Sequence, residues 1–156
     1  HLAELKDRLT ITHQTGEADF EKIRELYSRS DYPMADVRPF IANMFEEFAR
    51  ADLVICRAGA TTCAELAAAG KASIMIPLPT AADDHQRKNA EALEEGGAAK
   101  MLLQADLNGE TLADMIRSTI GDAEKLSEME AAAKAMGRAD AAERTADIIE
   151  ELRNSI

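Results

Sequence analysis

Five residues with chemically useful side chains or backbones lie close together in the middle of this chain: Arg57, Gly59, Thr61, Thr62 and Glu65. Arg57 follows an apolar run, Gly59 permits a tight turn, and the two threonines open a helical pattern. The start of a helix presents unpaired N–H groups and a partial positive charge, which suit a diphosphate. Glu65, one turn further, could accept hydrogen bonds from two sugar hydroxyls. The spacing Thr62-x-x-Glu65 is also that of a capping box, which needs no ligand, and spacing alone favours that simpler alternative.

A second polar segment follows the next apolar run. Asp83 or Asp84 could cap the helix that follows, and its first turn carries His85, Gln86 and Asn89 on one side. Imidazole and amide groups are well suited to recognising hydroxyls, although an ordinary polar helix start would look the same. The adjacent aspartates lack the D-x-D spacing of a metal–diphosphate site, and His85 has no second His or Cys nearby. The sequence therefore predicts no metal site.

A third candidate is the pair Phe40 and Ile41 at the end of a predicted strand. An aromatic and an aliphatic side chain there could pack on a flat base while backbone groups recognise the edge of that base. A place in the core is the simpler interpretation of Phe40. The two cysteines, Cys56 and Cys63, form no C-x-x-C pair, and we expect them to act as small buried hydrophobic residues.

The elements that would position these residues alternate along the chain. Strands are predicted at 9–12, 37–41, 53–56, 73–76 and 100–103, and helices at 17–29, 44–51, 62–69 and 86–95. Only helices follow, at about 110–120, 122–136 and 140–153. Several strand runs are continuously apolar, as expected of strands that are covered on both faces. The pattern predicts an α/β fold with a Rossmann-like parallel sheet and helices on both faces.

Composition limits the partners of the chain. Its 156 residues are 46% hydrophobic and carry a net charge of −11, which argues against a nucleic-acid partner. Residues 57–90 carry four basic and three acidic side chains, so a small anion would meet little repulsion there. No apolar run reaches the ~18–20 residues of a membrane span. The length predicts one domain over residues 1–156, and two cysteines without a disulfide framework predict a reducing cytosol.

Taken together, the segments resemble the carboxy-terminal half of the MurG family. Its members are bacterial N-acetylglucosaminyltransferases of glycosyltransferase family 28, with two Rossmann-like domains (the GT-B fold). The segments that carry the resemblance are 12–16, 40–41, 56–70, 77–90 and 140–144. In this order and spacing they are fairly specific to that family.

The resemblance implies a donor site for UDP-N-acetylglucosamine, without a cofactor or a tightly held metal. It assigns the uracil to Ile41 and the backbone around Phe40, and the ribose to Glu65. Arg57 and the helix start would face the diphosphate, and the sugar would contact the second polar segment, although many relatives have Gln in place of His85. The substrate-binding residues expected are Phe40, Ile41, Arg57, Thr61, Thr62, Glu65, His85, Gln86 and Asn89.

The resemblance also implies what the chain lacks. Family members transfer N-acetylglucosamine to lipid I with inversion and so make lipid II. Their acceptor site, proposed catalytic base and membrane-associating patch lie in an amino-terminal domain, which is absent here, as is the first strand with its glycine-rich turn. The chain starts at His1 without Met, so we expect a fragment that is inactive alone and carries no catalytic residue. The full-length protein would work at the cytoplasmic face of the inner membrane.

Two alternatives stay open at this point. The chain could be a non-catalytic donor-binding subunit of a split glycosyltransferase, which would need a separate membrane partner. It could also belong to a UDP-sugar 2-epimerase of the same fold, which would need acidic and histidine catalytic groups in both domains.

Overall fold

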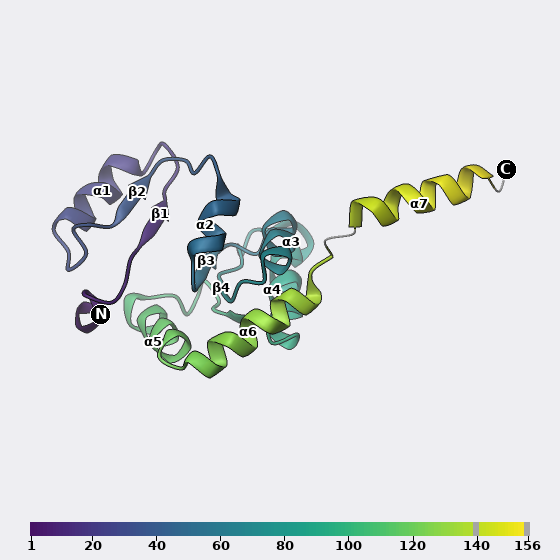
Figure 1. Cartoon of the computed structure of the whole chain (residues 1–156). Helices are drawn as coiled ribbons and strands as arrows, with labels where there is room; N and C mark the ends of the chain where they lie inside the picture. The colour runs from purple at the N-terminus through teal and green to yellow at the C-terminus, as the bar shows by residue number, and fades with distance from the viewer. Residues whose placement is uncertain (139–140, 155–156) are drawn as a thin grey trace. The chain divides into compact units, whose positions relative to one another are not determined.

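The computed structural model describes residues 1–138 and 141–154. The chain divides into two compact units, residues 1–47 and 48–156, and each unit has its own parallel sheet (Figure 1). Strands and helices alternate up to the fifth strand and only helices follow, as the sequence predicted. Within the described ranges, no helix combines the length and the apolar character needed to cross a membrane.

The first unit is a two-stranded parallel sheet with one complete helix. Its elements are η1 (Ala3–Leu5), β1 (Thr12–Gln14), α1 (Phe20–Ser28) and β2 (Asp36–Arg38), and α2 (Met44–Arg50) begins in it. Thr12 pairs with Asp36, and α1 packs against β2. The strand predicted at 9–12 begins only at residue 12, because the N–H groups of Arg8 and Leu9 still bond back to the Leu5 carbonyl in a turn.

The second unit has three parallel strands in the order β3-β4-β5. Its elements are β3 (Val54–Cys56), α3 (Ala60–Ala69), β4 (Ser73–Met75), η2 (Ala82–Asp84), α4 (His85–Glu95), β5 (Ala99–Met101), α5 (Gly109–Ile120), α6 (Ala123–Met136) and α7 (Ala141–Asn154). The central strand β4 is fully buried, as its continuous apolar run predicted. The helix predicted from residue 140 begins at Ala141, and residue 140 itself lies outside the described residues.

The strands form two sheets, whereas the sequence predicted one. Among the described residues, β1 pairs only with β2, and β3 pairs only with β4. The connection through α2 therefore leads from β2 to a strand of another sheet. Ile55, the middle residue of β3, lies on the edge strand and is 42% exposed, whereas the opposite edge strand β5 carries Lys100.

Helices α3 and α6 pack closely in the second unit (Figure 1). Gly70 ends α3 in the left-handed region, at φ 63°, which glycine adopts without steric cost. Gly137 follows α6 and approaches α3 so closely that a Cβ would lie 2.7 Å from the Ala67 carbonyl oxygen. These contacts fix α3, whose first turn carries part of the candidate site.

Candidate functional site

The ends of β3 and β4 bring two of the predicted polar segments to the same edge of the sheet. Cys56 and Met75 are paired across these strands, and the N–H of Ile76 donates to the Cys56 carbonyl at 2.9 Å. The segments 57–59 and 76–84 therefore leave the sheet side by side. Open α/β sheets bind their ligands at this carboxyl edge.

The first turn of α3 has open backbone donors. The helix begins at Ala60 with Gly59 as N-cap, and no side chain caps it. The first helical bond runs from the Cys63 N–H to the Gly59 carbonyl at 2.9 Å, and the N–H groups of Ala60, Thr61 and Thr62 have no acceptor among the described residues. Three open donors at the positive end of a helix suit an anion.

The capping box Thr62-x-x-Glu65 that spacing favoured is therefore wrong. The helix starts two residues earlier than predicted, so Thr62 is its third residue and Glu65 its sixth. Both lie inside the helix, where neither can be the N-cap. Glu65 is exposed, and its carboxylate has no hydrogen-bond or ion-pair partner in the part of the chain that the structure describes. It is thus available as an acceptor.

Gly59 does not serve the tight turn that the sequence predicted. Its φ of −66° and ψ of 146° are open to any residue. A Cβ at this position would have only Thr62 Oγ1 near it, at 3.9 Å. The N-cap side chain is the one that normally accepts from the second or third N–H of a helix. Glycine therefore leaves these donors uncovered.

Arg57 links the ends of the two strands. Its Nη1 donates to the carbonyls of Ile76, at 3.0 Å, and Pro77, at 3.3 Å. The Nε and Nη2 groups have no partner among the described residues. One side of the guanidinium is thus tied to the protein, and the other can bind an oxyanion.

Helix α4 begins after a strained turn. Asp83 and Asp84 both adopt left-handed backbone angles, at φ 51° and 56°. Asp84 is the N-cap but its side chain makes no capping bond, so the predicted aspartate cap is wrong. A capping residue usually has an extended backbone, whereas the backbone of Asp84 is left-handed. The Nδ1 of His85 donates to the Ala82 carbonyl at 2.7 Å, which leaves Nε2 as an acceptor in the neutral ring.

Two amide side chains of α4 are bonded to the loops after the strands. Gln86 Oε1 accepts from the Leu78 N–H at 3.0 Å. Asn89 Nδ2 donates to the Ala58 carbonyl at 3.0 Å. Gln86 keeps its NH2 group without a partner in the described residues, whereas Asn89 keeps its oxygen and one of its two amide N–H groups.

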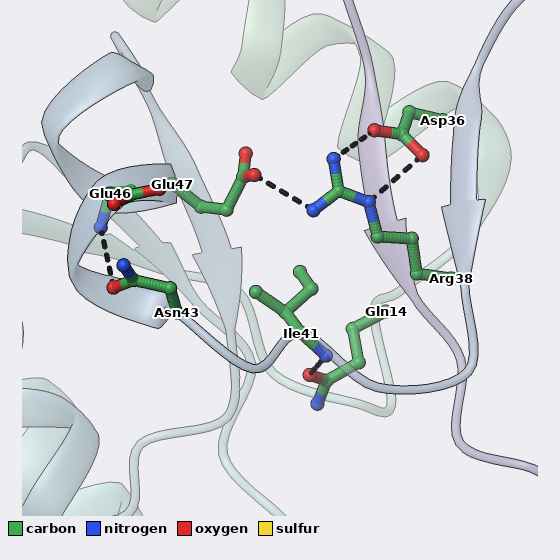
Figure 2. A network of polar contacts seen from close by, with 7 residues as sticks. All are labelled: Gln14, Asp36, Arg38, Ile41, Asn43, Glu46 and Glu47. Atoms are coloured by element: carbon green, nitrogen blue, oxygen red, sulfur yellow. Dashed lines mark hydrogen bonds and ion pairs between the residues drawn. The ribbon is translucent and has the colours of Figure 1, made fainter.

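Phe40 and Ile41 lie in the first unit, where Figure 2 shows the contacts of Ile41. Phe40 is 69% exposed, so its predicted place in the core is wrong, and Ile41 is buried at 8% exposure. The Ile41 N–H donates to Gln14 Oε1 at 2.8 Å. The Ile41 carbonyl accepts no hydrogen bond from the described residues, so it stays open as an acceptor.

The turn that holds Phe40 and Ile41 is fixed by Arg38 (Figure 2). Arg38 forms a two-pronged ion pair with Asp36 and donates to Glu47 Oε1 at 2.9 Å, so it joins β2 to α2. These hydrogen bonds, to Asp36 first and Glu47 second, raise the pKa of Arg38 above its usual value. Sequence reasoning did not predict that Gln14 would bind the Ile41 N–H. The only local sign was a polar side chain at the end of a strand.

The cysteines take no part in the site. Cys63 is buried, as predicted, and Cys56 is half-buried. Burial, and to a lesser degree the neighbouring Cys63, raises the pKa of Cys56 to about 12. Its thiol is thus protonated at neutral pH and a poor nucleophile. In the described ranges no group of three His, Cys, Asp or Glu side chains could hold a metal ion.

The structure thus brings together the expected residues of the second unit. Arg57 follows the end of β3, and Thr61 and Thr62 lie in the first turn of α3. The hydrogen bonds of Asn89 with Ala58 and of Gln86 with Leu78 bring the start of α4 to the same edge. Phe40 and Ile41 form their own cluster in the first unit.

Comparison with known proteins identifies the class that this fold and site define. The family model of the glycosyltransferase family 28 C-terminal domain matches residues 1–145. The crystal structure of Acinetobacter baumannii MurG superposes with a TM-score of 0.85 at 37% identity, over 96% of this chain and 44% of that one. The glycosyltransferase VinC shares the fold, with a TM-score of 0.64 at 17% identity, over 86% of this chain and 32% of that one. The chain is therefore an α/β domain of the GT-B type.

Sequence relatives make the assignment more specific. The chain is 52% identical over 139 residues to the UDP-N-acetylglucosamine–N-acetylmuramyl-(pentapeptide) pyrophosphoryl-undecaprenol N-acetylglucosamine transferase of Syntrophotalea carbinolica, covering 89% of this chain and 39% of that protein. It is 48% identical over 155 residues to the same transferase of Geobacter metallireducens, covering 99% and 42%. The chain belongs to glycosyltransferase family 28, in its MurG family, and the predicted resemblance is confirmed. It spans about two-fifths of the length of these relatives.

Proposed function

We propose that this chain is the donor-binding part of an enzyme that transfers N-acetylglucosamine from UDP-N-acetylglucosamine to lipid I, forming lipid II. The names of its relatives supply the reaction, since they describe an N-acetylglucosamine transferase that acts on a pyrophosphoryl-undecaprenol acceptor. Both compact units would belong to one donor-binding domain over residues 1–156.

The observation that carries the proposal is the uncapped start of α3. Three open N–H groups, the free side of Arg57 and the polar start of α4 lie at the carboxyl edge of β3 and β4. A diphosphate needs donors and positive charge in one place, and this edge supplies both without a metal.

Each remaining part of the donor has a proposed ligand. The Glu65 carboxylate would accept two ribose hydroxyls, and the Ile41 carbonyl and the Phe40 ring would hold the uracil. His85 Nε2 and the Gln86 NH2 group would bind hydroxyls of N-acetylglucosamine. In this scheme the chain binds UDP and stabilises it as a leaving group while the anomeric carbon is inverted.

The acceptor and the catalytic base would lie outside this chain, because it covers only about two-fifths of its relatives. Peripheral attachment to the cytoplasmic face of the inner membrane would also come from the rest of the full-length protein. No carboxylate or imidazole of the described site is assigned as a base.

The test is to purify the protein from the complete gene and, separately, residues 1–156. Each is incubated with UDP-N-acetylglucosamine and lipid I, and lipid II is measured. We expect product from the complete protein and none from 1–156, since positioning two substrates together can account for ~7–11 kcal/mol of a barrier. Failure of the complete protein to form lipid II would contradict the proposal, and epimerisation of the UDP-sugar would support the epimerase alternative.

A further inference from the structure

Asn89 was predicted to bind substrate, but one N–H of its amide already donates to a backbone carbonyl within the protein. We propose that Asn89 is a positioning residue: it holds the Ala58 carbonyl and so places the first turn of α3 for the diphosphate. The inference rests on the proposed function, because it assigns the residue that aligns that same site.

The contact of Asn89 reaches the backbone directly before the open helix start. Its Nδ2 donates at 3.0 Å to the carbonyl of Ala58, a residue with no exposed surface. That carbonyl belongs to the peptide unit shared with Gly59, the N-cap of α3. A shift of this peptide would move the N–H groups of Ala60 and Thr61 with it. Asn89 therefore acts on the orientation of the donors and not on the ligand.

The start of α3 needs such support because it lacks the usual kind. Gly59 has no side chain that could fasten the turn to the helix, and no other side chain caps it. A capping side chain at position 59 would accept from the same N–H groups that a diphosphate must reach. Asn89 stabilises the turn from the carbonyl side and leaves the donors open.

The neighbouring amide of α4 is arranged in the opposite sense. Gln86 uses its oxygen to accept from Leu78 and keeps its NH2 group open, whereas Asn89 uses its NH2 group to donate to Ala58. Changing each amide to an acid removes the NH2 group from both. At position 86 this leaves the bond to the protein in place, and at position 89 it breaks that bond.

The experiment compares Asn89→Asp with Gln86→Glu in the protein expressed from the complete gene. Both variants add one negative charge to the same helix, three residues apart, so each controls for the charge of the other. UDP and UDP-N-acetylglucosamine are titrated into each folded protein by calorimetry. For Asn89→Asp we expect both affinities to fall by the same factor, about 3- to 10-fold, as for the loss of one hydrogen bond. For Gln86→Glu we expect a larger loss for UDP-N-acetylglucosamine than for UDP.

The neutral variant Asn89→Leu, whose side chain has the same number and branching of heavy atoms, covers the case in which the acid does not fold. It should again weaken both ligands equally, and steady-state kinetics should show a raised KM for the donor. Selective loss of UDP-N-acetylglucosamine would overturn the inference and make Asn89 a sugar ligand. A lower melting temperature with unchanged affinities would also overturn it, because the role would then be structural only. A wild-type protein that does not bind UDP would instead contradict the proposed function.

Discussion

The starts of α3 and α5 are built in opposite ways, although each helix follows a strand of the same sheet. At α5, Asn108 Oδ1 accepts from the N–H groups of Glu110 and Thr111 at 2.9 and 3.0 Å, and the Thr111 hydroxyl accepts from the Asn108 N–H at 3.0 Å. This is a complete capping box. At α3, Gly59 provides no cap and the first three N–H groups stay open.

Side-chain caps are used selectively in this chain: α3 and α4, which follow β3 and β4, lack one, as does α1 of the first unit, whereas α5 has one. Helix α6 is capped as well, since Asp122 accepts from the Lys125 N–H at 3.1 Å. The chain thus contains residues suited to capping and places them at other helix starts. Glycine at an N-cap costs only a few tenths of a kcal/mol relative to the best residues. A small loss of stability therefore leaves an anion site available.

The largest effect is expected when α3 is given the kind of cap that α5 has. In Gly59→Asp, the extended backbone suits an N-cap, and the new carboxylate would accept from the Thr61 and Thr62 N–H groups. It would also repel the diphosphate, so we expect UDP affinity to fall about 100-fold while the melting temperature holds or rises slightly. Calorimetric titration and thermal denaturation measure the two effects.

The neutral variant Gly59→Ser separates the cap from its charge and should lose less affinity than the aspartate. A stabilised Gly59→Asp protein that binds UDP like the wild type would show that the diphosphate binds elsewhere.

Glu65→Gln tests the proposed ribose ligand, which is not part of a cap because α3 begins at Ala60. Since Gly59 is the N-cap, the substitution should leave the melting temperature unchanged. A carboxylate that accepts two ribose hydroxyls loses its charge and one acceptor, so UDP affinity should fall about 10- to 100-fold by titration. Glu128→Gln, an exposed acid of α6, makes the same change in net charge and is the matched control. Equal UDP affinities for the two variants would contradict the ribose assignment.

Asn108→Ala removes the cap at α5. The free energy of unfolding should fall by about 1 kcal/mol, with a drop in melting temperature of about 2–4 °C at this size. Denaturant titration measures the first quantity. We expect the affinity for UDP to stay the same, and a loss of affinity would mean that the start of α5 also belongs to the donor site.

Asp83→Gly gives the smallest expected effect and concerns the third kind of helix start, the strained one at α4. Glycine adopts a φ of 51° without the steric cost that aspartate has, which outweighs its larger entropy in the unfolded chain. The free energy of unfolding should rise by about 0.5 kcal/mol in denaturant titration. A destabilised variant would show that the Asp83 side chain contributes a contact that offsets the strain.

Spacing located the start of α3 within two residues but favoured the wrong N-cap. Thr62-x-x-Glu65 matches a capping box, yet Ala60 and Thr61 extend the helix backward to Gly59. Local pattern cannot decide which of several polar residues is the N-cap. Strands β3 and β4 were predicted within one residue, because a short and mostly apolar run marks each of them, although only β4 is fully buried.

Contacts between distant residues could not be predicted in this way. The bond from Ile41 to Gln14 joins residues 27 apart, and that from Asn89 to Ala58 joins residues 31 apart. Periodicity describes one element at a time, so it also gave no sign that the strands form two sheets. Side-chain amides can bond to any nearby backbone group, and only the fold selects one.

The first strand that the resemblance places ahead of this chain stays a prediction, and the outer edge of β3 is where a doubly wound sheet would add it. That edge has a consequence for handling the chain by itself. Val54–Cys56 offers neither a charge nor a proline against pairing with another molecule, in contrast to Lys100 on β5. Electrostatic repulsion from a net charge of −11 opposes such pairing, and salt screens that repulsion. Residues 1–156 should therefore stay dispersed in dilute, low-salt buffer and form aggregates as ionic strength or concentration rises.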